Sequence, residues 1–149
     1  MIRVRCQQHV TIDAKGRLAL PAPIRRAIDE MAQTSLVLTF AQGAVWAWTA
    51  DHYESDVEGR MMTQDPFEPH VLDFAHSMMS TAQDCEIDKQ GRIRIPPPLR
   101  ELAGLTKDCV VHVLLGKVEI WDREAWDRRF EESLSRTAQR GSGMPGRYE

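Results

Sequence analysis

Alternating and helical patterns of apolar residues follow one another along this chain. Alternation around Ile12, and again from Leu18 to Leu20, predicts two short strands with one apolar face each, because successive side chains of a strand point to opposite faces. A segment that begins near Pro23 then carries apolar residues at the spacing of one helix face, namely Ile24, Ala27, Ile28 and Met31. The pattern predicts a β-hairpin followed by a short helix.

The same pattern occurs twice. Residues 11–27, TIDAKGRLALPAPIRRA, return 75 positions later as EIDKQGRIRIPPPLREL at 86–102, with seven of seventeen positions identical. Unrelated segments of ordinary composition would share about one. The likeness continues downstream, where residues 36–53 match 110–126 at an offset of 73. The chain therefore contains two copies of one unit.

Each copy carries the sequence Asp-x-x-Gly between its two predicted strands. Asp13 and Gly16 hold these places in the first copy, and Asp88 and Gly91 hold them in the second. This spacing is typical of a type I turn followed by a left-handed residue, a common hairpin connection. Since the aliphatic residues of the second strand face a core, the residues between them face away from it. These outward residues include Arg17, Arg92 and Arg94.

One unit alone would bury only about 60% of its unfolded surface and would be marginally stable, so we expect both units to share a core around a pseudo-two-fold axis. Strands and helices in each unit predict the α+β class. The expected organisation is a first unit at 7–53, a helical connector at 54–83, a second unit at 84–126, a C-terminal helix at 127–137 and a flexible tail at 138–149.

Composition and charge narrow the class of protein. Of 149 residues, 42% are hydrophobic and 28% charged, a balance that excludes a chain disordered throughout. The net charge of −3 is unevenly distributed: residues 1–26 contain six Lys or Arg and one Asp (+5), whereas residues 27–83 contain nine acids and one Arg (−8). The basic end is compatible with a nucleic-acid partner. Without a long apolar run or a secretory signal, we expect a cytoplasmic protein.

Catalytic and metal sites are not favoured by the sequence. Cys6 and His9, and likewise Cys109 and His112, stand at a spacing used by zinc ligands, but residues three apart on a strand point to opposite faces. A thiol hydrolase would need a glycine-rich oxyanion segment and an orienting Asp, which no recognisable spacing provides. We therefore expect no metal, cofactor or enzymatic activity. Four tryptophans could stack on nucleotides, but packing is the better interpretation for Trp46, Trp48, Trp121 and Trp126.

The doubled motif resembles the MraZ family of bacterial transcriptional regulators, which contain two AbrB-type swapped-hairpin units. The likeness covers roughly residues 7–132 and rests on DAKGR at 13–17 and DKQGR at 88–92, each followed by a strand, Pro, a short helix and Arg. The blocks CEIDKQGRIRIPPPLRELAGL and GKVEIWDREAW are very close to the family pattern. The sequence departs from that pattern at Ile2–Val4 and within 73–83.

The resemblance implies a split β-barrel built by both units, with peripheral helices, and assembly into closed rings. It also implies a nucleoid-associated regulator, in most cases a repressor, that binds short tandem repeats in the promoter of the division and cell wall gene cluster. The family signature Asp-x-x-x-Arg maps onto Asp13 and Arg17, and onto Asp88 and Arg92. The two arginines are then expected to meet DNA.

Physical reasoning agrees with this expectation, because a two-stranded ribbon fits the major groove and arginine suits guanine edges or phosphates. Lys15 and Lys89 suit phosphates, and Arg94 would widen the contact. Arg25 and Arg100 on the short helices would either contact phosphate or brace a carboxylate. The aspartates would clamp an arginine or cap turn amides. A single chain should bind weakly, so an oligomer on repeated operators is expected.

Two other interpretations of the doubled motif are compatible with the sequence. The arginines could simply keep an exposed hairpin soluble, although their recurrence in both copies favours a function. The chain could also be an AbrB-type antitoxin that binds its own promoter and neutralises a toxin through its C-terminal tail. The segment after Leu134 is short and poorly amphipathic, which counts against that role.

Overall fold

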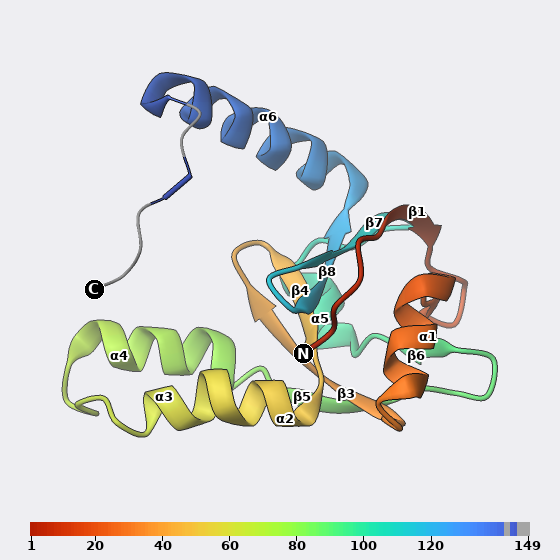
Figure 1. The fold of residues 1–149 in the computed structure, drawn as a ribbon, viewed down its shortest axis with the longest axis horizontal. Helices are drawn as coiled ribbons and strands as arrows, with labels where there is room; N and C mark the ends of the chain where they lie inside the picture. Colours follow the sequence, from red (N-terminus) through yellow and green to blue (C-terminus); the bar gives the residue numbers. More distant parts are fainter. Residues whose placement is uncertain (142–143, 146–149) are drawn as a thin grey trace.

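The computed structural model describes residues 1–141 and 144–145, and its strands form the centre of the molecule (Figure 1). The strands are β1 (Gln7–Thr11), β2 (Arg17–Ala19), β3 (Ser35–Ala41), β4 (Ala44–Trp48), β5 (Gln83–Glu86), β6 (Arg92–Arg94), β7 (Asp108–Leu114) and β8 (Lys117–Asp122). The helical elements, of which η1 and η2 have wider π-type turns, are α1 (Ala22–Glu30), α2 (Ala50–Tyr53), η1 (Glu54–Glu58), α3 (Gly59–Met61), α4 (Pro69–Phe74), η2 (Ala75–Met79), α5 (Pro97–Leu102) and α6 (Arg123–Arg140).

Six strands form one antiparallel sheet in the order β1-β7-β8-β4-β3-β5, and β2 pairs with β6 in a separate two-stranded ribbon. The expected α+β class is confirmed. The expected split barrel is not confirmed, since the strands within the described residues form an open sheet and no closed barrel is found. The physical reason is that β1 and β5, the two edge strands of the sheet, do not pair with each other. Each is followed in the chain by a strand of the ribbon.

The two copies of the repeat exchange strands. β1 of the first copy pairs with β7 of the second, and β5 of the second copy pairs with β3 of the first. Within each predicted hairpin only one bridge joins the two strands, Ile12 to Leu18 in one copy and Ile87 to Ile93 in the other. The hairpins therefore open beyond their turns, and their second strands meet each other as the β2–β6 ribbon.

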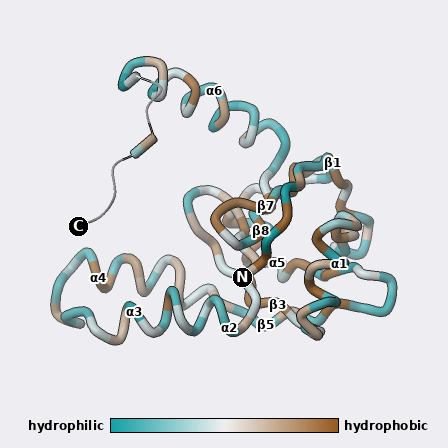
Figure 2. The backbone as a smooth tube through the Cα atoms, viewed as in Figure 1, coloured by the Kyte–Doolittle hydropathy of each residue, from teal (hydrophilic) through white to brown (hydrophobic). Residues whose placement is uncertain are grey.

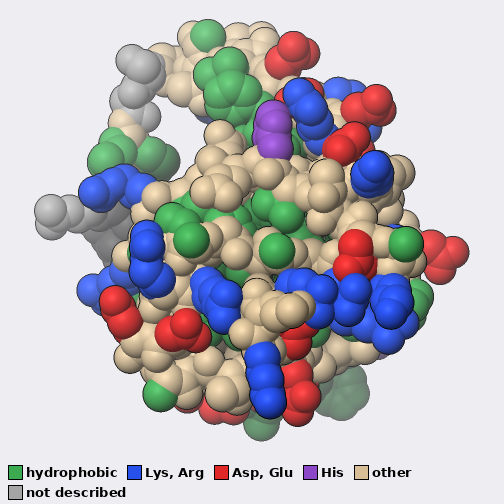
Figure 3. Space-filling view, turned by 90° about the vertical axis from the view of Figure 1, so that its right-hand side faces the viewer, with side chains coloured by type: hydrophobic (Ala, Val, Ile, Leu, Met, Phe, Trp, Pro, Cys, Tyr) green, Lys and Arg blue, Asp and Glu red, His purple; other side chains and the backbone are tan. Residues whose placement is uncertain are grey.

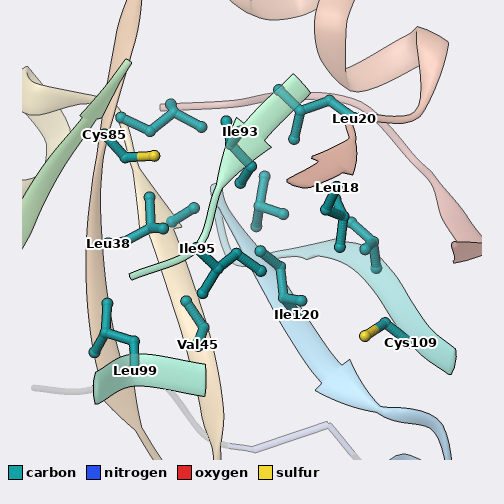
Figure 4. Close-up of a cluster of buried hydrophobic side chains, with 14 of the residues drawn as sticks. Leu18, Leu20, Leu38, Val45, Cys85, Ile93, Ile95, Leu99, Cys109 and Ile120 are labelled. Atoms are coloured by element: carbon teal, nitrogen blue, oxygen red, sulfur yellow. The ribbon is translucent and has the colours of Figure 1, made fainter. Parts of the chain in front are cut away.

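The main apolar core lies between the six-stranded sheet, the ribbon and the two short helices (Figure 4). It takes matched side chains from both copies, since Leu18 and Ile93 of the ribbon are fully buried, as are Ile24 of α1 and Leu99 of α5. Pro23 and Pro98 stand in the first turns of these helices, where the missing N–H costs nothing. Because the same positions are buried in both copies, both copies carry apolar residues there, and this shared pattern made the repeat recognisable.

The opposite face of the sheet is covered by a second apolar cluster. Its members come from β3, β4, the helical segment after β4 and η2, and they are Val37, Trp48, Tyr53, Val57 and Met78. The helical connector is only partly buried, because Val71 and Met78 are buried but Phe74 is 41% exposed. Leu102, at the end of α5 in the second copy, is 54% exposed.

Two helical arms project from this body in the same direction, the hairpin of α2 to α4 and the long α6 (Figure 1). Helix α6 runs to Arg140, beyond the end expected at residue 137, and contains no buried residue. Most of its length is hydrophilic (Figure 2). The expected flexible tail falls on residues of which 142–143 and 146–149 lie outside the described part. Among the described helices, none has the length and apolar character that a membrane span requires.

Candidate nucleic-acid interface

The β2–β6 ribbon presents three arginines on its outward face. In the antiparallel register Arg17 lies opposite Arg94, and Ala19 lies opposite Arg92. The pair between them points into the core, as alternation along a strand requires. Arg94 is exposed, whereas the side chains of Arg17 and Arg92 are 31% and 29% exposed. The ribbon thus brings together on one face three arginines that were expected only to point away from the core.

In the first turn, Asp13 performs both of the roles considered for it. Its Oδ1 accepts hydrogen bonds from the backbone N–H of Lys15 at 2.9 Å and of Arg17 at 3.0 Å. Its Oδ2 accepts a hydrogen bond from Nε of Arg17 at 2.8 Å. Gly16 completes the turn with a φ of 81°, in the left-handed region that favours glycine. The clamp holds the base of the guanidinium group, so the two Nη nitrogens lie beyond it.

The second turn repeats this geometry. Asp88 Oδ1 accepts hydrogen bonds from the N–H groups of Gln90 and Arg92, both at 2.9 Å, and Oδ2 accepts one from Nε of Arg92 at 2.9 Å. Gly91 has a φ of 76°. Both arginines therefore leave their turns in the same fixed orientation relative to their own aspartate.

The turn aspartates are held in the charged form by these contacts. The backbone hydrogen bond from Arg17, with contributions from its side chain and from the N–H of Lys15, lowers the pKa of Asp13 from 3.8 to about 2. The same contacts, led by the backbone N–H of Arg92, lower the pKa of Asp88. Each carboxylate is thus ionised and paired at neutral pH, and it orients an arginine rather than acting as an acid or base.

Lysines extend the positive charge on both turns. Lys15 and Lys89 are exposed and stand between the aspartate and the glycine of their turns. Both turns lie on the side of the molecule that carries α1, at the right-hand edge of Figure 1. Figure 3 looks onto this side and shows a band of Lys and Arg side chains across it, with some Asp and Glu between them. The structure thus gathers cationic groups from both copies on one face.

Arg25 and Arg100 lie against the turns rather than pointing away from the body. Arg25 donates hydrogen bonds to two backbone carbonyls of the second turn, those of Lys89 and Gln90. Arg100 lies against Gly16 of the first turn. These two arginines were expected to contact phosphate or to brace a carboxylate. Contacts with the backbone of a turn could not be predicted, because the sequence does not show which helix packs against which turn.

A buried ionic cluster on the opposite face of the sheet was not anticipated. Glu119 accepts hydrogen bonds from Trp121 Nε1 at 2.8 Å and Lys117 Nζ at 3.1 Å, and its Oε1 lies 3.0 Å from Nε2 of His112. Lys117 Nζ also lies 4.1 Å from the ring centroid of Trp46. Burial raises the pKa of Glu119, but these hydrogen bonds and the charge of Lys117 outweigh it and lower the pKa to about 2. The sequence contained one indication of this cluster: Lys117 and Glu119 alternate with aliphatic residues, so the two charged side chains lie on the same face of one strand.

The aromatic residues that could have stacked on nucleotides pack within the protein instead. Trp48 and Trp121 are buried, and Trp126 stacks on Phe130 with ring centroids 5.8 Å apart. Cys109 is fully buried in the main core, whereas His112 lies on the opposite face of the sheet beside Glu119. Burial and the nearby carboxylates raise the pKa of the Cys109 thiol to about 11, so this thiol is not prepared for nucleophilic attack.

Comparison with known proteins adds two findings to this geometry. The family model described as "MraZ protein, putative antitoxin-like" matches residues 78–142. The chain is also 37% identical over 124 residues to a protein of Treponema denticola named transcriptional regulator MraZ, and the match covers 83% of this chain and 84% of that relative. The residues that the family model matches include the second turn and β6.

Proposed function

This chain belongs to the MraZ family of transcriptional regulators, and we propose that it binds duplex DNA through the outward face of the β2–β6 ribbon. The observation that carries the proposal is the placement of Arg17, Arg92 and Arg94 on one face of a two-stranded ribbon. An antiparallel ribbon is narrow enough to enter the major groove, where each base pair presents a distinct pattern of donors and acceptors. No catalytic step forms part of this function.

The groups divide by the part of DNA that they suit. The clamped guanidinium groups of Arg17 and Arg92 present a fixed planar fork, which matches the O6 and N7 atoms of guanine or two phosphate oxygens. Lys15 and Lys89 stand at the tips of the turns as mobile charges that suit the flanking phosphates. Asp13 and Asp88 act indirectly, because each fixes the direction of its arginine.

Binding by one chain is expected to be weak, since these five cations offer few contacts and the net charge of the chain is −3. We infer that several linked chains bind tandem promoter repeats together, which would raise affinity by a factor of roughly 10² to 10⁴. Helix α6 supports this inference, because Phe130 and Leu134 are 49% and 55% exposed on a helix with no buried residue. Such a surface suits contact with another copy.

From the family resemblance we infer which genes are regulated and that they are repressed. The inferred protein is a repressor that assembles as a ring, is associated with the nucleoid and acts on the division and cell wall gene cluster. A promoter repeat that the ribbon occupies would be closed to the transcription machinery, and this physical exclusion is sufficient for repression.

The test is a titration of the full chain against a promoter fragment with tandem repeats and against the same fragment with the repeats scrambled. Arg17→Gln with Arg92→Gln is the test variant, and Arg60→Gln on the helical arm is the matched control. We expect the test variant to lose repeat binding and to reduce the slope of log K against log salt by about two, because about 0.9 counterion is released per phosphate contact. Unchanged affinity and slope in the test variant would refute the assigned surface.

The second candidate function is an antitoxin that represses its own promoter. The observation in its favour is the exposed apolar side of α6, which could cover a toxin instead of another copy. A stoichiometric second polypeptide that copurifies with the chain and is lost in a Phe130→Ser, Leu134→Ser variant would support this candidate. A single polypeptide in the purified complex would refute it.

A further inference from the structure

The short helix of the first copy is linked directly to the DNA-facing turn of the second copy. From α1, Arg25 donates Nη2 to the carbonyl of Lys89 at 2.9 Å and Nη1 to the carbonyl of Gln90 at 3.2 Å. These residues are 64 and 65 positions away from Arg25 in the chain. The planar fork of the guanidinium group therefore spans two successive peptide groups of the turn.

Gly91 permits this approach. A Cβ atom on Gly91 would lie 2.5 Å from Cδ of Arg25 and 2.6 Å from its Nε, distances that real Cβ contacts do not show. The glycine is thus required twice, for the left-handed φ of the turn and for the arginine that lies flat against it.

A matching contact occurs at the other turn. Nη1 of Arg100, on α5 of the second copy, lies 2.7 Å from the place that a Cβ of Gly16 would occupy. Backbone bonds cross in the same sense, since the N–H of Leu20 bonds to the carbonyl of Gly91 at 2.9 Å and the N–H of Ile95 bonds to the carbonyl of Gly16 at 3.2 Å. Each turn is therefore held by the other copy of the repeat.

We propose that Arg25 and Arg100 are positioning residues, each of which fixes the DNA-binding turn of the opposite copy. The proposal rests on the function proposed above for the ribbon and assigns a different role to these two arginines. Each Nη nitrogen of Arg25 donates one hydrogen bond to a carbonyl oxygen of the turn, so the open end of the guanidinium fork faces the turn. It also covers two carbonyl oxygens that would otherwise present negative charge beside Lys89 and the DNA.

Removal of the brace leaves the aspartate contacts of the turn intact but frees the peptide groups of Lys89 and Gln90. The turn would then have to be ordered when DNA binds, and the lost conformational entropy reduces the affinity. A direct phosphate contact would have another signature, because its removal also lowers the number of counterions released. Salt dependence therefore separates positioning from contact.

The experiment compares the wild type with Arg25→Gln, Arg25→Lys and Arg100→Gln, and it uses Arg26→Gln, the exposed neighbour on α1, as the matched control. Amide hydrogen exchange is followed by mass spectrometry in peptides that contain 13–17 and 88–92, without DNA, and affinity for the repeat fragment is measured over a range of salt. Thermal unfolding confirms that each variant is folded.

We expect a crossed pattern. Arg25→Gln should speed exchange about tenfold at 88–92 and leave 13–17 unchanged, whereas Arg100→Gln should speed exchange at 13–17 only. Arg25→Lys, which keeps the charge but loses the fork, should resemble Arg25→Gln. Both Arg25 variants should bind DNA about tenfold more weakly with an unchanged salt slope. If the Gln variant fails to fold, the Lys variant supplies the same comparison.

Two results would overturn the proposal: unchanged exchange at 88–92 in the Arg25 variants, or wild-type behaviour of Arg25→Lys together with a salt slope lowered by about one in Arg25→Gln. Failure of the ribbon as the DNA surface is a separate result. It would appear as unchanged binding in the Arg17 and Arg92 variants, while the exchange pattern, which is measured without DNA, still reports on the brace.

Discussion

Arg17 and Arg94 lie directly opposite each other across the β2–β6 ribbon, whereas Arg92 lies opposite Ala19. Like charges in facing positions of an antiparallel pair destabilise it, and the clamp from Asp13 offsets only one of the two. An anion bound between the two arginines would offset the remaining repulsion. The ribbon is also asymmetric, because one end presents two arginines and the other presents one, which suits operator repeats that have a direction.

The first prediction concerns Arg94. Arg94→Ala removes one member of the facing pair, so we expect the free energy of unfolding to stay within about 0.5 kcal/mol of the wild-type value. The same change should weaken DNA binding and lower the salt slope by about 0.9 if the residue contacts phosphate. Urea unfolding and a binding titration check both parts. A loss of stability above about 1 kcal/mol with unchanged binding would show that Arg94 has a structural role instead.

The second prediction concerns Ala19, the exposed partner of Arg92. Ala19→Arg gives this end of the ribbon the pair that the other end already has, so we expect tighter binding to DNA of any sequence and a steeper salt dependence by about 0.9. Discrimination between repeat and scrambled fragments should fall, because nonspecific affinity rises more than specific affinity. Ala19→Gln is the uncharged control. Equal effects of the two substitutions would contradict a role for charge on this face.

The third prediction concerns the buried cluster around Glu119. Its pKa is lowered from 4.5 to about 2 in the folded protein, so the stability gained from its charge is complete above about pH 5 and is lost as the pH falls toward 2. Glu119→Gln leaves the buried Lys117 without its carboxylate and should cost about 3 kcal/mol at pH 7. The difference in unfolding free energy from the wild type should shrink between pH 5 and pH 2.

Chemical denaturation at a series of pH values measures this difference. Glu132→Gln, which alters an exposed pair with Arg136 on α6, is the control and should change little at any pH. A difference between wild type and Glu119→Gln that is constant from pH 7 to pH 2 would contradict the assigned charge state.

The fourth prediction concerns α6. Phe130 and Leu134 continue the helix face of Trp126, which packs against Trp121 with ring centroids 5.6 Å apart, but they extend past the sheet. Replacement of both by serine should lower the mass of the particle in solution toward the 17.0 kDa of one chain and weaken binding to tandem repeats by at least tenfold. Glu131→Ser on the same helix should keep the wild-type mass, as measured by light scattering. Unchanged mass in the double variant would exclude this surface.

The repeat made much of the fold predictable. The duplicated alternation around Leu18 and Ile93 located the two strands and predicted the burial of these residues, but the pairing of β2 with β6 was not predicted. The left-handed conformation of Gly16 and Gly91 was predicted from the Asp-x-x-Gly spacing and is confirmed. These features are local, because they depend on side-chain alternation and turn geometry within a few residues.

Features that depend on contacts between distant segments could not be predicted in the same way. The exchange of β1 and β5 between the copies places Arg25 beside Lys89, and no local pattern encodes that pairing. Burial of Lys117 and Glu119 likewise depends on other strands, since Trp46 of β4 lies beside Lys117 and His112 of β7 lies beside Glu119. The expected split barrel, which is not confirmed, also depends on such contacts, since closure depends on how the edge strands leave the sheet.

Site-specific crosslinking can identify the surface of the chain that contacts DNA. A cysteine placed at Ala19, on the outward face of the ribbon, is linked to a photoactivatable group, and Gln64→Cys on the helical arm serves as the matched site; the unsubstituted chain controls for its own three cysteines. If DNA binds the outward face of the ribbon, the probe at position 19 crosslinks to repeat-containing DNA and the probe at 64 does not. Crosslinks from position 64 with none from position 19 would refute DNA binding through the ribbon.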